Sequence, residues 1–169
     1  MTDLRGESLF DALQFKYRAV DFIADGDRGD LLEGALAWVR ETEDLPEVKV
    51  AVVTGPGGVG KSRLAAEICY QLAASDLWWR AGFADHQKLL AAPVPVVPTV
   101  VVVDYPERHP EAVGDYIASL HEARRTGVLQ APVRVVLVSR DERSWFERAP
   151  EPRPAHRPPH RTRRTRVQR

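Results

Sequence analysis

The chain has 169 residues, of which 44% are apolar, and this is enough for one globular domain with a buried core. Its 24 basic and 24 acidic residues balance overall but not along the chain. Residues 151–169 hold seven arginines and one acid, or +6, so residues 1–150 hold 17 basic and 23 acidic residues, or −6. An acidic body argues against a nucleic-acid-binding core and leaves any such binding to the tail.

A single cysteine, Cys69, excludes an internal disulfide and a cysteine-based metal cluster. The first residues lack a basic segment followed by an apolar run, so we expect no signal peptide. No uninterrupted apolar stretch approaches the about 18 residues that a membrane-spanning helix needs. We therefore expect a cytoplasmic location and no membrane contact.

Residues 1–46 are predicted to be a helical lead-in to the main domain. An amphipathic piece covers residues 9–17, and the Asp/Gly-rich run at 25–30 is typical of a loop. Leu32, Leu36 and Val39 then have the spacing of a helix over residues 31–41, which Pro46 closes.

Residues 47–149 are predicted to form the main domain, in which strands and helices alternate. Short β-branched runs predict strands at 49–54, 100–103 and 133–139, and the segment at 77–83 with its two tryptophans and a phenylalanine is predicted as a further strand. Helical spacing predicts helices at 61–74 and 111–124 and a short one at 85–91, while Pro93, Pro95 and Pro98 indicate a loop. The alternation predicts an α/β fold with three layers, in which helices cover both faces of a mostly parallel sheet of about four strands.

The last segment differs in composition from the rest of the chain. Residues 150–169 contain seven arginines, five prolines and one bulky apolar residue, Val167. Such a segment buries too little surface to offset its ordering entropy, so we predict a disordered tail. A solvated extension is the favoured interpretation, with contact to nucleic acid or acidic lipid as the alternative.

A complete phosphate-binding motif, G-x-x-x-x-G-K-[ST], occupies residues 55–62 between a predicted strand and a predicted helix. In this setting the glycines let backbone N–H groups face an anion, Lys61 reaches the β- and γ-phosphates, and the Ser62 hydroxyl ligates Mg²⁺. A glycine-rich turn that merely precedes Lys-Ser is disfavoured by the strand before it and the helix after it. The predicted nucleotide-binding residues are Gly55, Pro56, Gly57, Gly58, Val59, Gly60, Lys61, Ser62 and Arg63.

A second requirement for nucleotide chemistry is an acid at the end of a neighbouring strand. Asp104 follows four consecutive valines and is predicted to hold Mg²⁺ together with Ser62; an aspartate that only caps a strand is the alternative. Tyr105 stands where many ATPases place a second acid, and it is no base near neutral pH. Glu107 is the nearest carboxylate that could polarise the attacking water.

These motifs resemble the STAND class of P-loop ATPases, relatives of AAA and NB-ARC modules. The resemblance covers about residues 30–147 and rests on residues 55–67, residues 103–108 and residues 134–140 with the Trp-Phe pair at 145–146. It implies ATP and Mg²⁺ as cofactors and a γ-phosphate sensor role for Arg140. Family members hold the base with a segment that residues 21–28 match only loosely.

The resemblance also implies a five-stranded core in the order 5-1-4-3-2. Only four strands are predicted here, so we expect an incomplete core, as in a C-terminally truncated module, with the phosphate-loop strand at an open edge. Such an edge invites self-association or a partner chain, or it is covered by the N-terminal segment.

The leading functional hypothesis is an ATP-binding switch module with slow hydrolysis, in which Lys61, Asp104, Glu107 and Arg140 are the candidate catalytic residues. A fragment that holds a nucleotide or a partner without turnover is the first alternative. A small-molecule kinase and a DNA-stimulated ATPase are further alternatives. A GTPase is disfavoured because the guanine-binding motifs Asp-x-x-Gly and Asn-Lys-x-Asp are missing.

Overall fold

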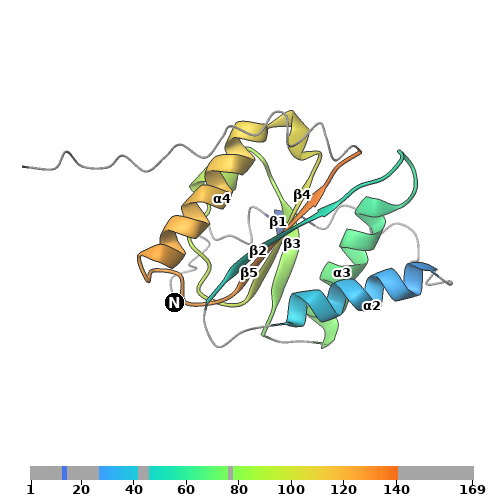
Figure 1. Ribbon diagram of the computed structural model, residues 1–169, viewed down its shortest axis with the longest axis horizontal. Coiled ribbons are helices and arrows are strands. Elements are labelled where there is room, and N and C mark those ends of the chain that lie inside the picture. Colours follow the sequence, from blue (N-terminus) through green and yellow to red (C-terminus); the bar gives the residue numbers. More distant parts are fainter. Residues whose placement is uncertain (1–12, 15–26, 42–45, 76–77, 141–169) are drawn as a thin grey trace, which may run out of the picture.

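The computed structural model describes residues 13–14, 27–41, 46–75 and 78–140. They form a mixed α/β domain whose sheet has four parallel strands and one short antiparallel strand, with helices on both sides (Figure 1). Its strands are β1 (Leu13–Gln14), β2 (Val48–Val53), β3 (Arg80–Ala84), β4 (Thr99–Asp104) and β5 (Val133–Val138). Its helices are α2 (Asp27–Arg40), α3 (Lys61–Ser75) and α4 (Pro110–Arg125), with short 3-10 helices η1 (Leu89–Ala91) and η2 (Pro106–Arg108). None of the described helices is long and apolar enough to cross a membrane.

The sheet has the strand order β1-β3-β4-β5-β2, and β3, β4, β5 and β2 run parallel. This confirms the predicted parallel sheet and places β2, the strand before the phosphate loop, at one edge. Among the described strands β2 pairs with β5 alone. The sequence did not predict β1, which pairs antiparallel with β3 at the opposite edge. A partner on the free side of β2 stays a prediction.

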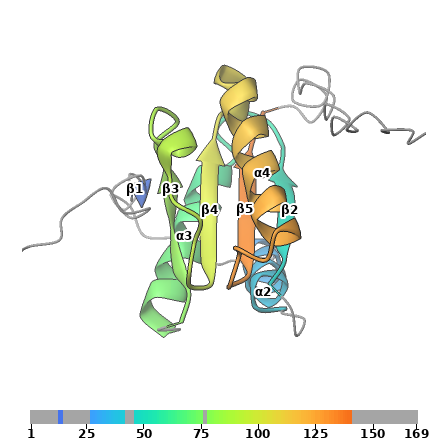
Figure 2. The ribbon, with the colours of Figure 1, turned by 90° about the vertical axis from the view of Figure 1, so that its left-hand side faces the viewer.

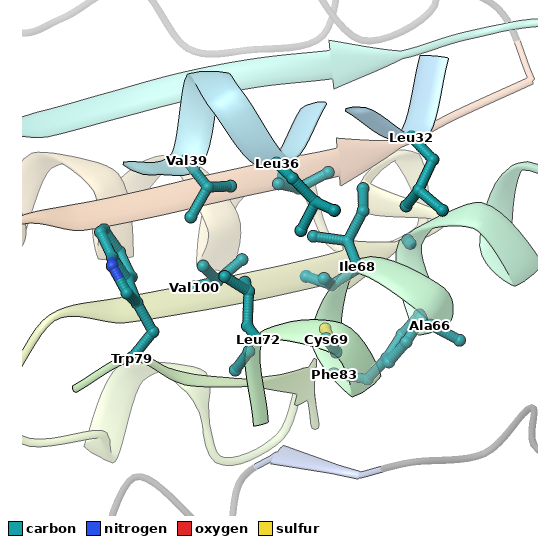
Figure 3. Packing of buried hydrophobic residues seen from close by; sticks show 14 of the residues in the cluster. Leu32, Leu36, Val39, Ala66, Ile68, Cys69, Leu72, Trp79, Phe83 and Val100 are labelled. Carbon is teal, nitrogen blue, oxygen red and sulfur yellow. The ribbon is translucent and has the colours of Figure 1, made fainter. Parts of the chain in front are cut away.

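Helices cover the two faces of the sheet unequally. The pair α2 and α3 packs on one face, and α4 lies on the other (Figures 1 and 2). On the first face, α2 contributes Leu32, Leu36 and Val39 to the same apolar cluster as Cys69 and Leu72 of α3 (Figure 3). Because both faces are covered, β4 and β5 are buried along almost their whole length, which explains the four consecutive valines of β4 and the mainly Val/Leu sequence of β5.

Two elements differ from the sequence-based predictions. Helix α2 begins at Asp27, so the loop predicted over residues 25–30 is wrong from that residue onward. Asp27 and Asp30 lie in its first turn, where negative charge is favourable beside the positive end of the helix dipole. In place of the helix predicted at 85–91, the structure has a turn followed by the short 3-10 helix η1. The amphipathic piece at 9–17 lies, apart from β1, outside the described residues, as does the predicted disorder of 150–169.

A buried cation fastens the end of α2 to the sheet. Arg134 of β5 has no exposed surface, and its Nη2 donates to the Glu47 carboxylate at 2.6 Å and to the backbone carbonyl of Glu41. Its guanidinium also lies 5.8 Å from the ring centroid of Trp38 and 5.7 Å from that of Trp79. One arginine therefore joins the end of α2, the start of β2 and the segment before β3.

The Arg134–Glu47 ion pair should make a measurable contribution to stability. Glu47→Gln leaves the buried guanidinium without a counter-charge, so we expect the free energy of unfolding at pH 7 to fall by about 3 kcal/mol. Chemical denaturation of the two proteins measures this difference. Glu122→Gln is the matched control: it breaks the exposed Glu122–Arg125 pair on α4 and should change little.

The difference in the free energy of unfolding between wild type and Glu47→Gln should depend on pH. Burial raises the pKa of the Glu47 carboxyl, but the hydrogen bond and charge of Arg134, helped by Lys49, outweigh this and hold the pKa below its ordinary value of 4.5. A carboxyl with a lowered native pKa stabilises the fold above its unfolded pKa and loses that contribution as pH falls through the native value. The gap between wild type and Glu47→Gln should therefore shrink below about pH 4.5. A gap that is constant down to pH 3 would contradict the role of the ion pair.

Candidate phosphate-binding site

The phosphate loop is a tight glycine turn between β2 and α3. Gly58 and Gly60 have φ values of 80° and 95°, in the region that residues with a Cβ avoid. Leu64 N–H donates to the Gly60 carbonyl at 2.8 Å, which starts the helical hydrogen bonding of α3. The first N–H groups of a helix have no carbonyl one turn earlier, so they face the loop as donors for an anion.

The Lys61 side chain folds back over the loop that precedes it. Its Nζ donates to the Gly55 carbonyl at 2.7 Å and to the Pro56 carbonyl at 2.9 Å. An ammonium group has three N–H donors, so these bonds leave one for a ligand in the loop. The two carbonyls also fix the position of the positive charge.

Ser62 and Asp104 meet although 42 residues separate them. Ser62 Oγ donates to Asp104 Oδ2 at 3.0 Å. Asp104 is the last residue of β4, where it lies opposite Val138 of β5, and Val138 in turn lies opposite Val53 at the end of β2. The register of three adjacent strands thus brings the acid to the level at which the phosphate loop begins.

The residues that follow β4 and β5 place further polar side chains at the site. Tyr105 N–H donates to the Val138 carbonyl at 2.9 Å, and the Arg140 guanidinium lies 5.5 Å from the Tyr105 ring centroid. Ser139 is buried, and its Oγ donates to Glu107 Oε2 at 3.2 Å. The Glu107 carboxylate therefore contacts the site through Ser139.

A cavity of about 230 Å³ opens where these segments meet. It is lined by Gly57, Gly58, Gly60, Lys61, Ser62, Arg63, Asp104, Tyr105, Val138, Ser139 and Arg140. Of the predicted site residues, Gly55, Pro56, Val59 and Glu107 are not part of this lining. The volume is below the about 300–1,000 Å³ of sites that enclose a whole small molecule, so the cavity suits phosphates better than a complete nucleotide.

The charges around the cavity favour an anion. Lys61, Arg63 and Arg140 contribute three cationic groups to the lining, against one carboxylate from Asp104. Arg63 is partly engaged by Glu67, with Nη2 and Oε2 3.9 Å apart. An α-helix N-terminus adds positive potential at the same place.

Ser62 and Asp104 also fit a magnesium ion. Within the described part of the chain no three His, Cys, Asp or Glu side chains gather as a metal site. Mg²⁺ does not require such a group, because it binds through one or two protein oxygens together with water and phosphate oxygens. The hydroxyl and carboxylate 3.0 Å apart supply two such oxygens.

The sequence-based prediction assigned no role to Ser139. For Tyr105 it stated only that this residue cannot act as a base. Both follow the carboxyl ends of parallel strands, where ligands of open α/β sheets bind, and this rule could have identified them. The Trp-Phe pair at 145–146 lies outside the described residues. Of the segment expected to hold the base, residues 21–28, only Asp27 and Arg28 are described, and both are in α2.

No protein-family profile matches the chain, and no curated protein matches it.

The positive φ at Gly60 gives a test of the loop conformation. Gly60→Ala meets no atom within 4 Å but places a Cβ at φ 95°, so we expect a loss of about 1–2 kcal/mol in the free energy of unfolding. Gly57→Ala is the control, since that backbone is outside the positive-φ region and the new Cβ meets only Arg140 Nε at 4.0 Å. Thermal or chemical denaturation that ranks the two variants equally would contradict this loop conformation.

Proposed function

We propose that the chain is a STAND-like, Mg²⁺-dependent ATP-binding module, with slow hydrolysis that serves signalling or regulation. The observation that carries the proposal is the 3.0 Å contact between Ser62 Oγ and Asp104 Oδ2 beside the glycine loop. A strand-end carboxylate in contact with the hydroxyl that follows the loop lysine is the arrangement that a magnesium–triphosphate complex requires.

Each group has a separate part in this proposal. The loop and the first turn of α3 direct N–H groups at the phosphates, and Lys61 adds a fixed positive charge. Ser62 and Asp104 hold the metal ion, which neutralises phosphate charge when bound. The preference for ATP over GTP rests on the family resemblance and on the missing guanine-binding motifs.

The same site supports a binding-only alternative. Tyr105 occupies the position that a second acid takes in many ATPases, and the Glu107 carboxylate accepts a hydrogen bond from Ser139 and is not part of the cavity lining. A nucleotide would then be held without turnover, and the module would respond to its presence alone.

Binding is the first test of the proposal. Titration calorimetry with Mg·ATP should show micromolar affinity for the wild-type chain, because cationic groups and N–H donors converge on the loop. Lys61→Ala removes one of these charges and should weaken binding at least about tenfold, equivalent to about 1.4 kcal/mol. Lys88→Ala, an exposed lysine outside the cavity, is the control. A folded wild-type chain that binds no Mg·ATP would refute the proposal.

Hydrolysis is tested on Glu107. The identity of the nucleotide recovered from the preloaded protein is followed over time by chromatography. We expect wild type to convert bound ATP to ADP and Glu107→Gln to slow this conversion by about 10²-fold, since the general-base contribution is lost. Glu111→Gln, on the exposed first turn of α4, should match wild type. ATP that stays intact in wild type would establish the binding-only alternative.

A further inference from the structure

Tyr105 has an unusual backbone conformation for its residue type. Its φ and ψ are both 55°, which makes it the one non-glycine residue with positive φ among the described residues. The left-handed region is disfavoured for a residue with a large side chain, and glycine or asparagine usually occupies it. Strain of this kind persists where the surroundings require it, and it concentrates at functional sites.

The side chain gives a reason for this conformation. The centroid of the Tyr105 ring lies 5.5 Å from the guanidinium carbon of Arg140 and 4.7 Å from that of Arg108. No described residue forms a hydrogen bond or an ion pair with the Arg140 side chain, so within this part of the chain the ring is its polar partner. An exposed arginine without such a contact would sample many rotamers and spread its charge over a wide volume.

The position of Arg140 relates this contact to the phosphate loop. Arg140 lines the cavity, and its Nε lies 4.0 Å from the place that a Cβ on Gly57 would take. It comes two residues after Val138, which is paired with Asp104 at the end of β4. The metal ligands Ser62 and Asp104 are the groups nearest the β- and γ-phosphates in such a site. A guanidinium held at this place would therefore act on the terminal phosphate of a nucleotide bound in the loop.

We propose that Tyr105 is a positioning residue: its ring holds the Arg140 guanidinium beside the phosphate loop and so produces a preference for nucleoside triphosphate over diphosphate. The inference rests on the proposed function, since it needs a nucleotide in the loop. It also explains why a tyrosine occupies a conformation that suits glycine. The strained backbone turns the ring toward Arg140, and the ring then restricts the guanidinium.

The test compares affinities for a non-hydrolysable Mg·ATP analogue and for Mg·ADP by titration calorimetry. Arg140→Ala should remove most of the preference for the triphosphate. Tyr105→Leu leaves Arg140 in place but mobile, so it should reduce the preference about two- to fivefold, the range expected for an exposed cation–π contact. Tyr105→Phe keeps the ring and should retain the preference. In the Arg140→Ala background, Tyr105→Leu should cause no further loss.

Tyr105→Gly separates positioning from a purely structural role. It removes the ring, as Tyr105→Leu does, but it also removes the Cβ that is unfavourable at φ 55°. We expect the glycine variant to have a higher thermal midpoint than the leucine variant and the same reduced preference. If Tyr105 had a purely structural role, the more stable glycine variant would also keep more of the preference for the triphosphate than the leucine variant.

The outcomes distinguish the inference from the proposed function. A folded wild-type chain that binds neither nucleotide refutes the proposed function. A wild-type preference that Tyr105→Leu leaves unchanged refutes the inference and leaves nucleotide binding in place, and additive effects of Tyr105→Leu and Arg140→Ala also refute it. Tyr70→Leu, which replaces an exposed tyrosine on α3 outside the cavity lining, is the control and should match wild type.

Discussion

The candidate site depends on the hydrogen-bonded register of three parallel strands. Asp104, Val138 and Val53 lie side by side on β4, β5 and β2, so the three chain segments that follow them begin at the same level. A slip of two residues in either ladder would move the Asp104 carboxylate about 6–7 Å along the strand, given the rise per residue, and so away from Ser62. The chemistry of the site is thus set by backbone pairing before any side chain takes part.

That pairing explains which features could be predicted from the sequence. A strand buried on both faces has a mainly apolar sequence, and the four consecutive valines of β4 and the Val/Leu residues of β5 predicted such strands. The glycine loop was equally clear, because its residue types serve local backbone conformations. Asp104 could be placed because parallel strands bring their carboxyl ends to one edge of the sheet. Local patterns of this kind account for the layered fold and for the Ser62–Asp104 contact.

Other features depend on contacts between distant segments and have no local signal. Arg134 looks like an ordinary polar residue in a strand, yet it is buried because Glu47, Trp38 and Trp79 from three other segments surround it. The hydrogen bond from Ser139 to Glu107 depends on where η2 places the carboxylate, which the residue order does not reveal. The start of α2 was missed for a different reason. A run of Asp and Gly is typical of a loop, but acids also suit the first turn of a helix.

An arginine lies near each end of β5, and the two arginines have opposite electrostatic environments. At its amino end, Arg134 is neutralised by Glu47 and enclosed by tryptophans, so this cation is unavailable to a ligand. At the carboxyl end, Arg140 lies at the cavity without a described counter-charge. The strand residues between them, 135–138, are apolar and buried, and together with the buried Ser139 they separate the structural cation from the one that faces the loop.

The edge position of β2 adds a thermodynamic consequence. Within the described sheet the phosphate-loop strand is joined through β5 alone, while Asp104 belongs to β4 on the far side of β5. Ser62 lies in the first turn of α3, so a metal-bound phosphate held by both Ser62 and Asp104 would connect the segment that follows β2 to the end of β4. Because this connection exists only when all three strands are in register, such a ligand binds the folded chain and not the unfolded one, and its binding free energy adds to the stability of the sheet. The residues proposed to bind the ligand would in this way also be the residues through which it stabilises this edge of the sheet.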